Sequence, residues 1–282
     1  MAARYRREQV QLCFFCTPAT MSADVLPMTH EQRRTKHVRD MGRENGLFRA
    51  CMDEIKSSHS RGQSLRNAML AAGLLTDAKC YAELLGQFYL ATRALESRLQ
   101  SQSSGLAATL YKKLQYHFTA GYEADLAHLL GASEWAVETE EMATPPARAY
   151  VKRIQAADDE TLCAAIMILW GPMAIGGGAL IMPRVKAQFG QGATHVFRSV
   201  VGDAGGGRAA RRTAFIEAFD TLTDDKQQQA RITRAAGALM TLNNEMMLAV
   251  QRSPWWSKYV KVGAAAMVLL AARWAWKSFQ KD

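Results

Sequence analysis

Two cysteines near the amino terminus, Cys13 and Cys16, have the spacing of a pair that could bind zinc or form a redox-active disulfide. A structural zinc site is usually completed by a second such pair, and the chain contains none. Thr17 follows the pair, so this is not the C-x-x-C-H motif that attaches a cofactor covalently. The pair by itself therefore assigns no metal site.

The other cysteines lie in segments whose composition favours helices. They are Cys51, Cys80 and Cys163. An odd total of five cysteines, most of them inside helix-like segments, indicates reduced thiols in the cytosol rather than a disulfide framework.

The chain carries a formal net charge of +9. Such an excess suits nucleic acid, an anionic membrane face or an acidic ligand. The basic clusters, such as Arg33-Arg34 and Arg211-Arg212, are not interleaved with aromatic side chains that could stack on bases. We therefore expect a solvated basic surface and no nucleic-acid partner.

Composition and periodicity predict an all-α protein. Hydrophobic residues make up 49% of the 282 residues, there are only seven prolines, and no run of alternating β-branched residues suggests a sheet. Thr76 is a candidate cap for a long helix over 77–101. Apolar residues recur there at mostly three- and four-residue steps, as on one buried face: Tyr81, Leu84, Leu85, Phe88, Tyr89 and Leu95.

Further helices are expected along the rest of the chain. The expected stretches are 35–45, 110–118, 122–130 stopped by Gly131, a helix opened by Pro145, 160–170, 208–221 and 225–250. We expect residues 28–252 to form one helical domain, preceded by a flexible extension over residues 1–27.

The carboxyl-terminal segment differs from the rest, because Val262–Ala272 is an uncharged run. The longer stretch Tyr259–Trp276 holds Lys261 and Arg273 near its ends, where their charges can reach the membrane surface. An amphipathic surface helix is the alternative, but the centre of the run lacks a polar face. We predict a transmembrane tail anchor over residues 254–277, with tryptophans at both interfaces: Trp255, Trp256, Trp274 and Trp276.

The predicted anchor indicates on which side of a membrane the domain lies. It does not decide between two candidate membranes. Only six residues follow Trp276, so the helical domain is expected on the cytosolic side. A short anchor with basic residues on both sides resembles those of the mitochondrial outer membrane, and a longer, more apolar one would suit the endoplasmic reticulum.

Four segments occur in a recognisable order. They are 76–99, 123–127 with Gly131 and Trp135 behind it, 150–154 preceded by Thr144-Pro145, and the glycines 176–178. Together they resemble the haem oxygenase family in order and approximate spacing, over roughly residues 30–250. Membrane-bound members of that family also end in a C-terminal anchor. The resemblance implies a haem oxygenase-like multi-helical domain plus a C-terminal transmembrane helix, with haem as the cofactor.

In that family haem lies between a proximal helix, whose histidine binds iron, and a distal helix bent at glycines. Gly177 and Gly178 match the family's glycine pair, and Gly176 takes the neighbouring position. Glycine allows the backbone to bend and to approach a ligand closely because it has no Cβ. A tight contact between helices is the alternative reason for these glycines.

The proximal ligand is ambiguous in this sequence. The run 35–39 matches a family pattern that places Arg39 at the iron-ligand position, and an arginine offers iron no lone pair. His37 is two residues away, which places it about 200° around a helix from Arg39. His59 is the second candidate, because the residues after it also resemble the family's first helix. The sequence therefore names His37 or His59 as the metal ligand.

Other positions implied by the resemblance lie on the distal side and at the haem edge. Ala174 falls where the family has an aspartate that organises proton-delivering water, and alanine cannot do this. Arg212 corresponds to a cation for the haem propionates, and Leu242-Asn243 to a pair that faces haem. The implied haem-contacting positions are Arg39, Ala174, Gly176, Gly177, Gly178, Arg212 and Asn243. No catalytic side chain is assigned.

Three functions follow from this sequence. The first is a membrane-anchored haem oxygenase that takes electrons from a reductase and releases biliverdin, iron and carbon monoxide. The second is a pseudoenzyme, a relative that binds haem, another tetrapyrrole or a protein partner without catalysis, as Arg39 and Ala174 suggest. The third is a tail-anchored helical adaptor, which would explain the anchor and the charge but not the ordered resemblance.

Overall fold

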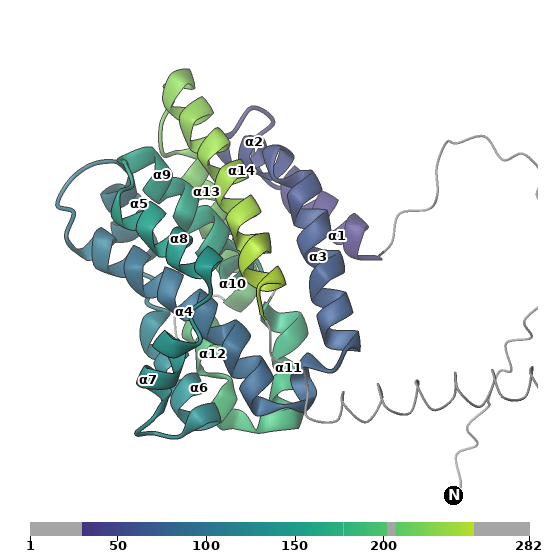
Figure 1. Cartoon of the computed structure of the whole chain (residues 1–282). Coiled ribbons are helices and arrows are strands. Elements are labelled where there is room, and N and C mark those ends of the chain that lie inside the picture. Colours follow the sequence, from purple (N-terminus) through teal and green to yellow (C-terminus); the bar gives the residue numbers. More distant parts are fainter. Residues whose placement is uncertain (1–29, 177, 202–206, 251–282) are drawn as a thin grey trace, which may run out of the picture. The chain divides into compact units, whose positions relative to one another are not determined.

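The structure, a computed structural model, describes residues 30–176, 178–201 and 207–250 (Figure 1). These residues form helices and no strands, which confirms the predicted all-α class. The chain divides into two units, 1–37 and 38–282. The expected extension over 1–27 and the expected anchor over 254–277 lie outside the described residues. Within the described helices, none has the length and apolar character needed to cross a bilayer.

The helices are mostly short. The α-helices are α1 (His30–Asp40), α2 (Leu47–Glu54), α3 (Lys56–Ala71), α4 (Ala78–Gln100), α5 (Leu106–Leu114), α6 (Thr119–Leu130), α7 (Trp135–Glu141), α8 (Pro145–Gln155), α9 (Asp159–Ala165), α10 (Gly171–Ile175), α11 (Gly178–Phe189), α12 (His195–Val201), α13 (Gly207–Asp220) and α14 (Lys226–Leu248). Shorter turns are the 3-10 helices η1 (Leu74–Thr76) and η3 (Gln191–Ala193) and the π-helix η2 (Ile166–Trp170).

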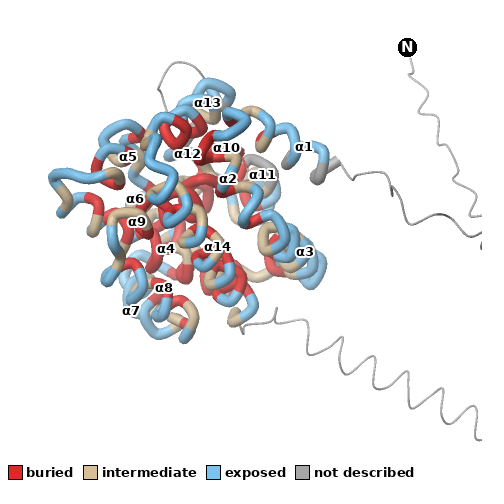
Figure 2. The backbone as a smooth tube through the Cα atoms, turned by 90° about the horizontal axis from the view of Figure 1, so that it is seen from above, coloured by how far each residue is buried: buried red, intermediate tan, exposed pale blue. Residues whose placement is uncertain are grey.

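Two 23-residue helices, α4 and α14, organise the second unit. Helix α4 packs against α6 and α8, and α14 packs against α2, α3, α8 and α9. Figure 2 shows that the buried positions lie on the sides of the helices that face the centre of the bundle, and the exposed positions lie on the outer turns. Trp170, Tyr150 and Phe48 are among the largest fully buried side chains. Burial of this apolar surface is the main force that holds the short helices together.

The predicted face of α4 is largely confirmed, and its predicted cap is wrong by one residue. Tyr81, Leu85 and Tyr89 are buried. Asp77 rather than Thr76 caps the helix, because its carboxylate accepts hydrogen bonds from the Lys79 and Cys80 N–H groups at 2.8 and 3.2 Å. Thr76 instead belongs to the preceding 3-10 turn. Both residues are good capping types, so the sequence could not choose between them.

Two other predicted boundaries are wrong as well. The stretch expected over 35–45 ends at Asp40, and Gly46 serves as the N-cap of α2. The stretch expected over 110–118 is α5, which stops at Leu114 because Gln115 adopts a left-handed conformation with φ 50°. The predicted stop at Gly131 is confirmed, with φ 105°.

Carboxylates from distant helices cap the N-terminal ends of four of the described helices. A helix N-terminus carries unpaired N–H groups and a partial positive charge, so a carboxylate satisfies both. The pairs are Asp220 with Phe48 of α2, Asp159 with Ala107 of α5, Glu96 with Phe118 at the start of α6, and Asp125 with Val196 of α12. Each bond joins segments more than twenty residues apart in the chain.

Asp220 makes the longest of these connections. It is 7% exposed and lies at the C-terminal end of α13. It accepts hydrogen bonds from the Arg43 N–H at 2.8 Å and the Phe48 N–H at 3.0 Å. The carboxylate occupies the space that a Cβ on Gly46 would need, so this turn requires glycine.

We expect Asp220→Ala to lower the free energy of unfolding by about 1–3 kcal/mol, because two amides lose a charged acceptor in a buried site. Asp220→Asn keeps one acceptor oxygen and should lose less. Asp224→Ala, four residues away and exposed, is the control. Urea unfolding followed by circular dichroism measures the difference. Equal stability of the Asp220→Ala and Asp224→Ala variants would contradict this capping role.

Candidate functional site

Helix α3 presents one face that is only half buried. Gly62 is the only one of its sixteen residues that is fully buried. Partly buried residues recur along the helix at steps that keep them on one face with Gly62: His59, Gln63, Arg66 and Leu70. His59 therefore lies on the inward side of α3, about 60° around the helix from Gly62. Its imidazole is the only one on this helix.

Helix α14 contacts α3 on either side of His59. The Asn244 Nδ2 group donates a hydrogen bond to the Ser58 carbonyl at 2.8 Å. A Cβ built on Gly62 would lie 2.6 Å from Asn244 Oδ1 and 3.4 Å from Met240 Cε. Contacts at the first of these distances are too short for a real Cβ, so Gly62 allows α14 to approach. The resemblance singled out Asn243, whereas the neighbouring Asn244 makes this contact.

Arg39 is engaged with acidic neighbours. Its guanidinium forms ion pairs with Asp40 at 2.7 Å and Asp53 at 3.2 Å, and the hydrogen bond to Asp40 is the main cause that raises its pKa. The side chain is thus a charged donor with no lone pair for iron. His37 is exposed and belongs to the unit 1–37, whereas Arg39 and His59 belong to the unit 38–282.

The expected distal helix consists of three pieces, α9, η2 and α10. Pro172 has no N–H to donate to the carbonyl of Ile168, and an α-helix cannot pass through that point unchanged. The π-helical turn Ile166–Trp170 lies immediately before it, as is typical where a helix absorbs such a disruption. The segment predicted to end at Trp170 therefore continues to Ile175.

The glycine run ends α10 and begins α11. Gly176 has φ 109°, a left-handed conformation that favours glycine. A Cβ on Gly178 would lie 2.8 Å from the Phe197 ring and 3.0 Å from Met173 Sδ. Gly177 lies outside the described residues. Gly176 and Gly178 thus each have a structural reason to be glycine. Gly176 allows the chain to bend, and Gly178 allows α12 to approach closely.

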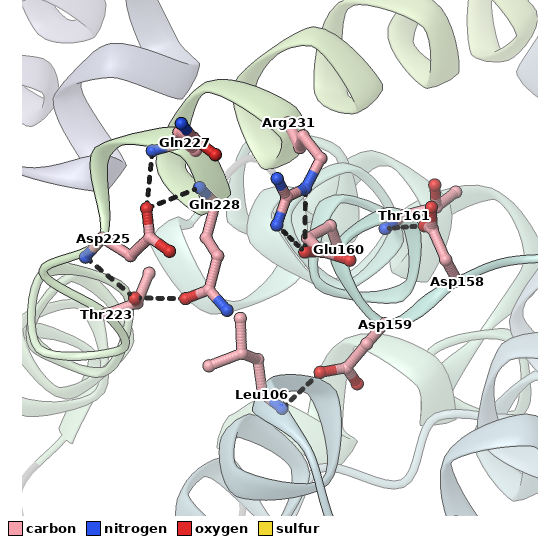
Figure 3. A network of polar contacts seen from close by, with 10 residues as sticks. All are labelled: Leu106, Asp158, Asp159, Glu160, Thr161, Thr223, Asp225, Gln227, Gln228 and Arg231. Carbon is pink, nitrogen blue, oxygen red and sulfur yellow. Dashed lines mark hydrogen bonds and ion pairs between the residues drawn. The ribbon is translucent and has the colours of Figure 1, made fainter.

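The distal helix carries no carboxylate beyond its first turn. Ala174 is 1% exposed and offers only a methyl group. The three acids at the start of the helix are used for structure (Figure 3): Asp158 bonds the Thr161 N–H, Asp159 caps α5, and Glu160 pairs with Arg231 at 2.7 Å. From Thr161 to Ile175, Cys163 is the only ionisable residue. A carboxylate-based proton relay is therefore absent from this stretch.

Helix α13 contributes the expected cation. Arg212 is half buried, and its buried Nε has no hydrogen-bond partner among the described residues. Arg211 precedes it and lies close enough to Tyr116 to oppose the rise in that phenol's pKa caused by burial. Ile216, one turn later, is fully buried and supplies no second charge. Asn243 on α14 is also buried.

The described cysteines are not candidate iron ligands. The thiols of Cys51, Cys80 and Cys163 are buried. Burial raises the pKa of Cys51 to about 12 and also raises that of Cys163, so both are protonated at neutral pH. The described residues contain no group of three or more metal-binding side chains. Cys13 and Cys16 lie outside them.

The sequence and the fold both match a known family. A family model described as "Heme oxygenase" matches residues 47–249. Because this match covers most of the chain, the protein belongs to the haem oxygenase family. The matched range contains α2 through α14, and therefore His59, but neither His37 nor Arg39. Among curated protein sequences, none matches significantly.

Solved structures support the same fold. A haem oxygenase 2 from Chlamydomonas reinhardtii, solved without haem, has a TM-score of 0.63 and 23% identity over 75% of this chain and 100% of its own. A haem oxygenase-1 from the cyanobacterium Synechocystis, in complex with haem, has a TM-score of 0.60 and 18% identity over 85% and 99%. The enzyme from Leptospira interrogans gives 0.61 and 16% over 72% and 98%.

The burial of the described thiols predicts that they react slowly with alkylating reagents in the folded protein. In a Cys13→Ser/Cys16→Ser variant, iodoacetamide at pH 8 should modify neither Cys51 nor Cys163 in the folded protein, because burial suppresses their reactive thiolates. Both should react after denaturation in urea, which is the internal control. Mass spectrometry counts the adducts. Rapid labelling of Cys51 or Cys163 in the folded variant would contradict their protonated, buried state.

Proposed function

We propose that this protein binds haem with His59 as the iron ligand and degrades it to biliverdin, iron and carbon monoxide. The observation that carries the proposal is the position of His59. It lies within the range that matches the family, on the half-buried face of the first long helix in that range. A neutral imidazole nitrogen is a common ligand for iron.

The residues present fit haem in two respects. His59 provides an imidazole on an inward helix face. Arg212 provides a cation whose Nε has no partner among the described residues. A guanidinium is well suited to a propionate carboxylate. Bound haem would supply the redox and oxygen chemistry, and the chain's part would be to hold and orient it.

A second candidate is haem binding without catalysis, and Ala174 is the observation that favours it. At the position of the family's distal aspartate, this chain has a buried methyl group. Proton delivery needs a polar group or an ordered water at hydrogen-bonding distance. Trp170 Nε1, in the π-helical turn before Ala174, is buried without a described partner, but it is a neutral donor and no substitute for a carboxylate. The two candidates share haem binding and differ in turnover.

We also propose a partner and a location for the protein. Haem degradation consumes electrons, so an electron-donating reductase is the expected protein partner. The uncharged run 262–272 with its flanking tryptophans supports a tail anchor over 254–277. The domain would then face the cytosol from the mitochondrial outer membrane or the endoplasmic reticulum. The tail-anchored adaptor remains the function left if haem does not bind.

A hemin titration of the full chain in detergent tests the ligand. We expect a histidine-ligated absorption spectrum, and we expect His59→Ala to abolish it and to weaken binding about tenfold or more, as for the loss of other metal-site groups. His37→Ala, an exposed histidine outside the matched range, is the matched control and should behave as the unaltered chain. Loss of the spectrum in His37→Ala instead would reverse the assignment.

Turnover separates the two candidates. With a reductase and NADPH, biliverdin formation by the unaltered chain supports the enzyme, and hemin binding without biliverdin supports the non-catalytic relative. In the second case, we expect Ala174→Asp to bring measurable biliverdin formation, because it restores a carboxylate on the distal helix. Ala164→Asp, equally buried but on α9, is the control. The absence of hemin binding would overturn both candidates.

A further inference from the structure

Asn244 contacts α3 through a hydrogen bond from its amide nitrogen, while its amide oxygen makes no described hydrogen bond. It is 5% exposed, and its Nδ2 donates to the Ser58 carbonyl at 2.8 Å. Its Oδ1 is buried and has no hydrogen-bond partner among the described residues. The orientation of the amide follows from chemistry, because only the nitrogen can donate to a carbonyl. Leaving a buried carbonyl oxygen unpaired is costly, so a purely apolar contact would be more stable here.

The unpaired oxygen lies where Gly62 has no side chain. A Cβ on Gly62 would be 2.6 Å from this oxygen, a distance that real Cβ atoms essentially never show. The asparagine amide and the glycine therefore form one contact, in which the glycine provides the space that the amide fills. Asn244 thus touches α3 at two points, Ser58 and Gly62.

These two points bracket His59 along the helix. Ser58 directly precedes it, and Gly62 follows three residues later, so both lie within one turn. A rotation of α3 by one residue step, about 100°, would break the Ser58 bond and turn a side chain onto the asparagine. The contact with Asn244 consequently fixes the rotation of α3 at the turn that carries His59.

Large apolar side chains contribute little to fixing this rotation. Gly62 is the one buried residue of α3, and Leu70 packs against the core only partly buried. Besides α14, the elements that α3 contacts most are α2 and the turn η1, which adjoin its two ends. A helix that lacks interlocking core side chains needs a directional contact to hold one orientation.

We propose that Asn244 is a positioning residue. It sets the rotation of α3 and thereby orients the His59 imidazole toward the haem iron. This inference rests on the proposed function, because it concerns the residue assigned there as the iron ligand. Groups that orient a metal ligand typically change affinity ten- to a hundredfold when they are removed. Asn244 acts through α3 and is not assigned a contact with haem.

The test uses the full chain and hemin, with two readouts. We expect Asn244→Ala to weaken hemin binding about tenfold and to give a mixture of ligation states in the absorption spectrum. Hydrogen exchange of the α3 amides should increase, while that of α4 stays unchanged. Glu245→Ala, the exposed next residue on α14, is the control and should leave hemin affinity and exchange in α3 unchanged.

The glycine supplies an independent check. Gly62→Ala should reproduce both effects, because its methyl group displaces the amide. Gly237→Ala is the control, since the atoms nearest to its Cβ would all belong to the exposed side chain of Glu54, which can move away. The Gly62→Ala/Asn244→Ala double variant should lose no more affinity than either single variant, as expected for residues that act through one contact.

The outcomes separate the two proposals. Unchanged hemin affinity and unchanged α3 exchange in Asn244→Ala would overturn the positioning role while leaving the proposed function standing. Faster α3 exchange with unaltered hemin affinity would also overturn it, since α3 would then be held for stability alone. The absence of hemin binding by the unaltered chain would refute the proposed function and, with it, the ligand role of His59. The exchange data would still show whether Asn244 holds α3.

Discussion

Capping of short helices by carboxylates from distant parts of the chain is the interaction on which this fold depends. Helices of seven to twelve residues are marginal on their own, and each begins with unpaired N–H groups. Asp220, Asp159, Glu96 and Asp125 satisfy these groups on α2, α5, α6 and α12. Each bond also fixes where one helix starts relative to another. These four acids are therefore committed to architecture.

The candidate site is built differently from these short, capped helices. Helix α3 is long, carries one half-buried face and contacts α14 at Asn244 and Met240 through the space that Gly62 leaves. The distal helix contributes backbone bends at Pro172 and Gly176 but no acidic group after Glu160. Binding and proton delivery are thus separable properties of this molecule.

Much of this could be predicted from the sequence, because apolar periodicity determines helices and their inner faces. The face of α4 was predictable for that reason, and the stop at Gly131 was predictable because glycine readily adopts a positive φ at a helix end. Asn244 was not, since its role depends on a carbonyl and a glycine more than 180 residues away. The choice between Asp77 and Thr76 as a cap, and the end of α5 at Gln115, depend on backbone conformation that neighbouring residues do not determine. The iron ligand stayed ambiguous because two short patterns competed.

The π-helical turn Ile166–Trp170 has a consequence for how this chain is compared with others. A π-turn holds one residue more than an α-turn, so it behaves as an insertion hidden inside a continuous helix. When this helix is aligned with a regular α-helix, the residues after the turn are offset by one position relative to the residues before it. A correspondence counted from Arg153 and one counted back from Gly176 will therefore disagree, even when both helix ends superpose.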